Sequence, residues 1–135
     1  MKPETANYLD KAREDLRDAQ TIAAVGLAKV AARSAYYAGF HAAEAILSEY
    51  TGKIAKTHSG VRTELARLAI TTLAIDKTFP AFLAKTYKYK EVSDYSIGPD
   101  AVITVDEARD AIENAVRFVE LVTALLTDEP SKDKP

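Results

Sequence analysis

The fold is decided by the stretch Arg33-Ser-Ala-Tyr-Tyr-Ala-Gly-Phe-His-Ala-Ala-Glu-Ala-Ile-Leu47, which lies within an apolar helical pattern running from about Ala28 to Tyr50. Between Arg33 and Glu44 this pattern contains almost no charge. A helix so poor in charge must be buried around most of its circumference. We therefore expect it at the centre of a helical bundle, or at a surface shared with a second subunit. Its core-facing stripe is predicted to contain Tyr36, Phe40, Ala43 and Leu47.

Helical spacing continues on both sides of this stretch. Apolar residues recur at steps of three and four from about Thr5 to Val25, and Gly26 is placed to end that helix. Thr57 or Ser59 can cap a third helix, in whose first turn we expect His58 to be an ordinary helical residue.

Two further helices are predicted after the third. A short one runs from Phe79 to Lys90, with Pro80 in its first turn, where the proline ring is tolerated. The last one begins at Thr104, because Glu107 three residues later completes a capping box. No segment alternates as a strand would. We therefore expect one all-α domain over residues 1–127, with four main helices and a short extra helix before the last one, and a flexible tail over residues 128–135.

The composition limits the class of protein. A chain of 135 residues that is 47% hydrophobic and 28% charged has enough apolar mass for one core. It contains no cysteine, which excludes disulfides and thiolate zinc sites and is compatible with the cytoplasm. It also lacks the apolar segment that a secretory signal or a membrane span requires. We expect a cytoplasmic protein without a membrane segment.

Positive charge is concentrated in the middle of the chain. The net charge is only −2, yet residues 52–90 hold eight lysines and arginines against two acidic residues. The segment from Phe79 to Lys90 interleaves aromatic residues with lysines and lacks any acid. Tyrosine rings stack on bases while lysines contact phosphates, so Lys85, Lys88 and Lys90 are candidates for binding single-stranded nucleic acid. The alternative is an amphipathic helix with a solvated lysine face.

Candidate catalytic residues come from the central helix. The chain has no phosphate-binding glycine loop, no HExxH motif and no histidine cluster with metal spacing, so we predict no metal and no cofactor. His41 can serve as a general acid or base, and Arg33 can stabilise charge on a phosphoryl group. Together they suffice for metal-free RNA cleavage by the neighbouring 2′-hydroxyl.

Helix geometry tests whether these residues can cooperate. Tyr37, a candidate substrate contact, is four residues from His41 and shares its helix face. Arg33 is eight residues from His41, which leaves a lateral offset of roughly 80° around the helix axis. The alternative is that His41 is a hydrogen-bonded residue of the core or of a dimer interface.

Four segments of the chain form a series, namely Ala35–Leu47, Lys56–Val61, Lys90–Tyr95 and Ile103–Ala108 with the helix that follows it. In this order they resemble the HEPN (higher eukaryotes and prokaryotes nucleotide-binding) domain family, in particular its small stand-alone prokaryotic members. The resemblance implies an antiparallel helical bundle that commonly forms a homodimer. Many members are metal-independent ribonucleases, in which an R-x(4–6)-H motif from each subunit lines a shared cleft. A nucleotidyltransferase-like antitoxin is often the partner.

The chain departs from that motif in two places. Seven residues separate Arg33 from His41, and Ser34 stands where related sequences tend to carry the arginine. Lys90 stands where relatives commonly have arginine, which keeps the positive charge but removes bidentate pairing. Two functions are therefore open: a homodimeric ribonuclease or toxin that uses His41 and Arg33, or a non-catalytic module that binds a nucleotide or a protein partner. In the first, the substrate contacts are Tyr37, Lys85, Lys88 and Lys90.

Overall fold

The computed structural model describes residues 1–72, 74–99 and 101–127. Within these ranges the chain forms five α-helices and contains no strand, which confirms the predicted all-α fold. None of these helices is both long enough and apolar enough to span a membrane. The tail expected over residues 128–135 lies outside the described residues. The helices are α1 (Pro3–Ala24), α2 (Ala28–Thr51), α3 (His58–Thr71), α4 (Thr78–Tyr95) and α5 (Val105–Thr127).

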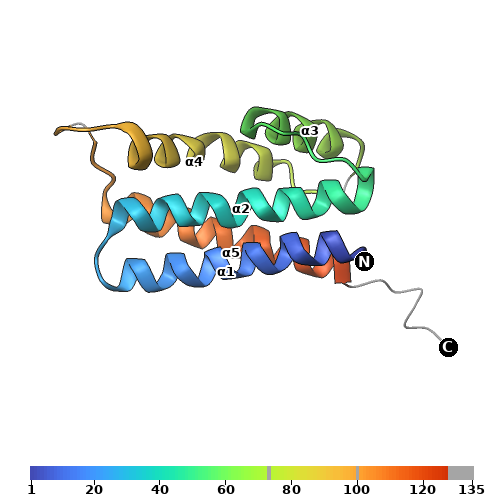
Figure 1. Cartoon of the computed structure of the whole chain (residues 1–135), viewed down its shortest axis with the longest axis horizontal. Helices are drawn as coiled ribbons and strands as arrows, with labels where there is room; N and C mark the ends of the chain where they lie inside the picture. The colour runs from blue at the N-terminus through green and yellow to red at the C-terminus, as the bar shows by residue number, and fades with distance from the viewer. Residues whose placement is uncertain (73, 100, 128–135) are drawn as a thin grey trace.

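Helix α2 is the centre of the molecule. Figure 1 shows it between α3 and α4 on one side and α1 and α5 on the other, and it contacts all four of them. More than half of its residues are buried. The scarcity of charge in this helix therefore has the predicted cause, which is packing on several sides. The buried set includes the whole predicted stripe of Tyr36, Phe40, Ala43 and Leu47.

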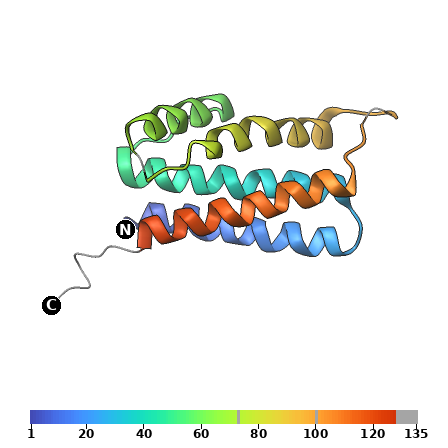
Figure 2. The same cartoon turned by 180° about the vertical axis from the view of Figure 1, so that it is seen from behind.

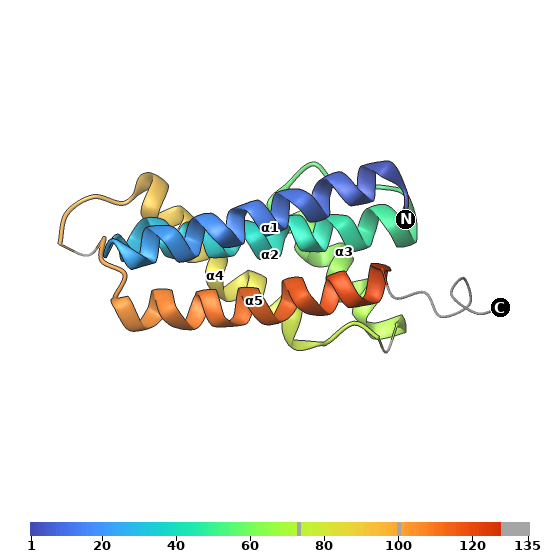
Figure 3. The ribbon, with the colours of Figure 1, turned by 90° about the horizontal axis from the view of Figure 1, so that it is seen from below.

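The four long helices alternate in direction. Helices α1 and α4 run opposite to α2 and α5, as the two views in Figures 1 and 2 show. Seen from below, α1 and α5 lie side by side (Figure 3), and Arg13 of α1 donates a hydrogen bond to Thr123 of α5 at 3.4 Å. The result is an antiparallel four-helix bundle, with the shorter α3 beside α4.

The helix before the last one is longer than predicted. The sequence predicts a short helix ending at Lys90, whereas α4 continues to Tyr95 and has 18 residues; the short helix is α3, with 14. The extension has ionic support. The amine of Lys90 lies 3.5 Å from the carboxylate of Asp94 one turn later, and Asp94 also pairs with Arg33 of α2 at 2.6 Å. The apolar periodicity could not reveal it, because these contacts join charged groups.

The helix ends follow the predicted local chemistry. The Thr57 hydroxyl caps α3 by accepting a hydrogen bond from the N–H of Gly60 at 2.9 Å. Thr104 and Glu107 form the reciprocal bonds of a capping box at 2.9 and 3.0 Å. Gly26 follows α1 with a φ of 87°, a left-handed conformation that glycine adopts without a steric penalty. These signals are local, so the sequence was sufficient to find them.

Candidate functional site

His41 lies where α1 and α2 meet, at an open depression of about 240 Å³. The depression brings together three of the residues that the sequence singled out, because Arg33, Tyr37 and His41 all line it. The remaining lining residues are Lys11, Asp15 and Ser34.

Arg33, Tyr37 and His41 form a ladder along α2. The guanidinium carbon of Arg33 lies 4.9 Å from the centroid of the Tyr37 ring, and this ring stacks on the His41 ring with the centroids 5.9 Å apart. Side chains four residues apart lie one above the other on a helix. Tyr37 therefore lies between Arg33 and His41 and contacts both.

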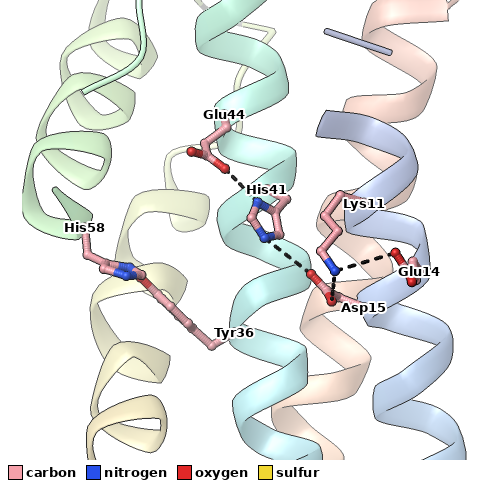
Figure 4. A network of polar contacts seen from close by, with 7 residues as sticks. All are labelled: Lys11, Glu14, Asp15, Tyr36, His41, Glu44 and His58. Carbon is pink, nitrogen blue, oxygen red and sulfur yellow. Dashed lines mark hydrogen bonds and ion pairs between the residues drawn. The ribbon is translucent and has the colours of Figure 1, made fainter. Parts of the chain in front are cut away.

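Two carboxylates contact the His41 imidazole (Figure 4). Its Nδ1 atom lies 2.6 Å from Oε1 of Glu44, and its Nε2 atom lies 3.5 Å from Oδ2 of Asp15 on α1. The first distance is that of a strong hydrogen bond, whereas the second exceeds the usual range. In the neutral imidazole, the contact with Glu44 favours the proton on Nδ1. Nε2 is then the ring nitrogen with a free lone pair.

Asp15 is a buried acid that reasoning from the sequence missed. The residue is only 8% exposed, and its Oδ2 has no hydrogen-bond partner among the described residues. Burial raises the pKa of Asp15, while the charges of His41 and Lys11 act in the opposite direction. The available signal was its position between the buried Ala12 and Ala19 on the apolar stripe of α1.

Asp94 of α4 holds Arg33 at the rim of the depression. The Nε atom of Arg33 donates to Oδ1 of Asp94 at 2.6 Å, and Oδ2 lies 3.5 Å from the amine of Lys90. Lys90 is buried, with its amine 5.1 Å from the centroid of Tyr95 and 5.8 Å from that of Tyr87. Burial alone would raise the pKa of Asp94, but the hydrogen bonds and charges of Arg33 and Lys90 lower it. Asp94 thus joins two of the predicted site residues.

The other two lysines of α4 lie outside this cluster. Lys85 is exposed and its amine lies 3.5 Å from a carboxylate oxygen of Asp110 on α5. Lys88 is exposed as well. Helix α4 contacts both α2 and α5, so its lysines are divided between its faces. Of the predicted substrate contacts, only Tyr37 and Lys90 are placed near Arg33.

The second histidine belongs to an aromatic cluster between α2 and α3. Nδ1 of His58 lies 2.6 Å from the hydroxyl of the buried Tyr36 (Figure 4), and its ring packs on Phe40 with the centroids 4.4 Å apart. Burial lowers the pKa of His58, and the charges of Lys90 and Arg62 add to this effect. His58 is the first residue of α3, as expected, but its contact with Tyr36 was not foreseen.

The depression is suited to proton transfer next to an anion. It holds an imidazole, a guanidinium, an amine and a carboxylate. Among the described residues, no three His, Asp or Glu side chains are grouped as ligands for a metal ion. The chemistry that this set of groups supports is acid–base catalysis beside a charged substrate group.

Comparison with known proteins places this architecture in a family. The family model of the HEPN domain matches residues 5–125, a range that includes all residues of the depression. No curated protein matches the chain. Because the match covers nearly the whole sequence, the chain belongs to the HEPN domain family.

Proposed function

We propose that this protein is a metal-independent ribonuclease that acts in the cytoplasm as a homodimer, the toxin of a pair whose antitoxin is nucleotidyltransferase-like. One observation carries the catalytic part: Arg33, Tyr37 and His41 line a single open depression, in which Glu44 orients the imidazole. Membership of the HEPN family supports the dimer and the antitoxin.

The reaction uses the groups of the depression in turn. Nε2 of His41 takes the proton of a ribose 2′-hydroxyl, and the oxygen attacks the adjacent phosphorus. Arg33 stabilises the negative charge that develops on the non-bridging oxygens. The bond from phosphorus to the 5′ oxygen breaks, and this oxygen takes a proton from solvent. Asp15 stabilises the imidazolium, and Tyr37 offers a stacking face for a base.

The decisive experiment is RNA cleavage in the presence of EDTA. The purified protein should cleave a single-stranded RNA, and His41→Gln should lower the rate by about 100-fold or more, as expected for the loss of a general acid–base catalyst. Arg33→Gln should lower it as well. His58→Gln is the matched control, because it removes the only other histidine, which lies outside the depression. Equal cleavage by His41→Gln and the unchanged protein would contradict the proposal.

A non-catalytic binding module is the second candidate, and the pairing of charges in the depression favours it. Arg33 contacts Asp94, His41 contacts Glu44, and Lys11 lies 3.6 Å from Asp15. A substrate must displace some of these contacts before it reaches the cations. RNA or nucleotide binding without any cleavage by the unchanged protein would select this function.

A further inference from the structure

The carboxylate of Asp94 bridges two cations that come from different helices. Its Oδ1 atom accepts a hydrogen bond from Arg33 of α2 at 2.6 Å, and its Oδ2 atom lies 3.5 Å from the amine of Lys90 on α4. Guanidinium and ammonium groups placed in this way satisfy two oxygens of a phosphate as readily as two oxygens of a carboxylate. Asp94 therefore fills a position that has the chemistry of a phosphate site.

The place of Asp94 within α4 is unfavourable for the helix itself. Asp94 is the penultimate residue of α4, where the partial negative charge of the helix C-terminus disfavours an acid. The contacts with Arg33 and Lys90 offset this, since they hold its pKa below the ordinary value although burial alone would raise it. The side chain is 21% exposed, so it is able to turn toward solvent when another anion takes its place.

Aromatic rings border the same position. The Arg33 guanidinium lies over Tyr37 at 4.9 Å, and the Lys90 amine lies over Tyr95 at 5.1 Å. Tyr95 is 71% exposed, so a face of its ring is open to a base. Cations that alternate with accessible aromatic rings are typical of surfaces that bind single-stranded nucleic acid.

We infer that Arg33 and Lys90 form a binding position for an RNA phosphate, and that Asp94 occupies it as an internal competitor until the RNA displaces it. This inference rests on the proposed function, because it takes RNA as the ligand. Displacement of Asp94 also transfers the Arg33 guanidinium from a carboxylate to the RNA phosphate, the contact that the proposed reaction requires. RNA binding and the assembly of the reactive site are therefore coupled through one carboxylate.

The test compares the RNA affinities of Asp94→Asn and Asp106→Asn. The probe is a fluorescein-labelled single-stranded RNA whose 2′-hydroxyls are methylated, so that it is not cleaved. Asp106 is a matched control, since it also pairs with an arginine, Arg109 at 2.9 Å, and does not line the depression. Asp94→Asn should bind about three- to fivefold more tightly than the unchanged protein at low salt, the range expected for release of one ion pair. Asp106→Asn should change the affinity less.

Two more variants complete the test. Asp94→Ala removes the carboxylate and replaces it with a residue of higher helix propensity. This variant should show the same gain in RNA affinity. Adding Arg33→Gln to Asp94→Asn should abolish the gain, because one of the two cations is then missing. An Asp94→Asn protein that binds no more tightly than the unchanged one, or a gain that persists without Arg33, would show that Asp94 is only a structural clamp.

Failure of this inference and failure of the proposed function give different results. If unmodified RNA is cleaved but Asp94→Asn binds RNA no more tightly than the unchanged protein, the ribonuclease proposal is supported and the role of Asp94 as a competitor is refuted. If Asp94→Asn binds RNA more tightly but neither the unchanged protein nor any variant cleaves unmodified RNA, the phosphate position is supported and the catalytic proposal is refuted.

Discussion

Single residues in this protein take their properties from neighbours on other helices. The two histidines illustrate this. Carboxylates of Asp15 and Glu44 contact the ring of His41, whereas cations lie near His58. Part of each difference is local, since Glu44 lies three residues from His41 in α2 and Arg62 lies four residues from His58 in α3, whereas Asp15 of α1 and Lys90 of α4 come from other helices.

His58 is expected to make the stability depend on pH. Its pKa is lowered in the folded protein, first by burial and then by the charges of Lys90 and Arg62. The unfolded chain therefore binds a proton at this residue at a higher pH than the folded protein does. Consequently the free energy of unfolding should fall as the pH drops through the unfolded pKa of about 6.5.

The variant His58→Gln tests this expectation, because glutamine retains an acceptor for the Tyr36 hydroxyl and does not titrate. The loss of unfolding free energy between about pH 7.5 and pH 5.5 should be smaller in the variant than in the unchanged protein. Urea unfolding at each pH measures it. His41→Gln serves as the comparison for the other histidine. If His58→Gln and the unchanged protein lose the same unfolding free energy, His58 is not the residue that makes the stability depend on pH.

At the scale of elements, the start of α5 depends on its capping box. Thr104 and Glu107 satisfy each other's backbone N–H groups. Thr104→Ala should lower the free energy of unfolding by about 1 kcal/mol, because an N–H at the helix start loses its partner. Glu107→Gln is the control, since glutamine also completes a capping box and should change stability little. Urea unfolding measures the stability of both variants. A Thr104→Ala variant as stable as the unchanged protein would show that this cap does not stabilise α5.

The packing of α2 on α4 depends on Gly39. A Cβ atom at this position would lie 2.7 Å from Cε2 of Phe82 and 3.1 Å from Cδ2 of Leu83. Phe82 is buried with its ring 5.2 Å from that of Phe118, so it has little room to move. Alanine favours a helix over glycine by about 1 kcal/mol. Overpacking a core costs about 1–3 kcal/mol, so the cost of the clash should exceed the gain in helix propensity.

Gly39→Ala should therefore lower the free energy of unfolding by about 1 kcal/mol, as measured by urea unfolding. Ser34→Ala is the control on the same helix, because it changes helix propensity without adding a Cβ atom. It should be neutral or slightly stabilising. An increase in stability for Gly39→Ala would show that α4 yields to the added methyl group.

At the scale of the whole molecule, the proposed homodimer predicts a stability that depends on concentration. Apolar residues are exposed around the start of α2 and in the segment that leads into α5, including Leu27, Val30 and Val102. Association stabilises the folded state by mass action, so the melting temperature should rise with protein concentration. Sedimentation equilibrium should show a dimer at micromolar concentrations. A monomer with a constant melting temperature would count against the shared cleft.

The sequence by itself determined the helices of this protein. Apolar spacing, the scarcity of charge in α2, Gly26 after α1 and the cap at Thr104 are local signals, and each acts within a few turns of its own segment. They were sufficient for the all-α fold, for the central place of α2 and for the alignment of Tyr37 with His41. They failed at the end of α4, where ion pairs extend the helix to Tyr95.

Only the tertiary structure decided which charged groups meet. Asp15 reaches His41 from α1, Asp94 reaches Arg33 from α4, and His58 reaches Tyr36 from α3. The same structure pairs Lys85 with Asp110 of α5 and Lys90 with Asp94 of α4, although only four residues lie between the two lysines. Such pairs depend on the axial register and the rotation of one helix against another. These are set by the packing of the whole core, so no spacing within a single helix specifies them.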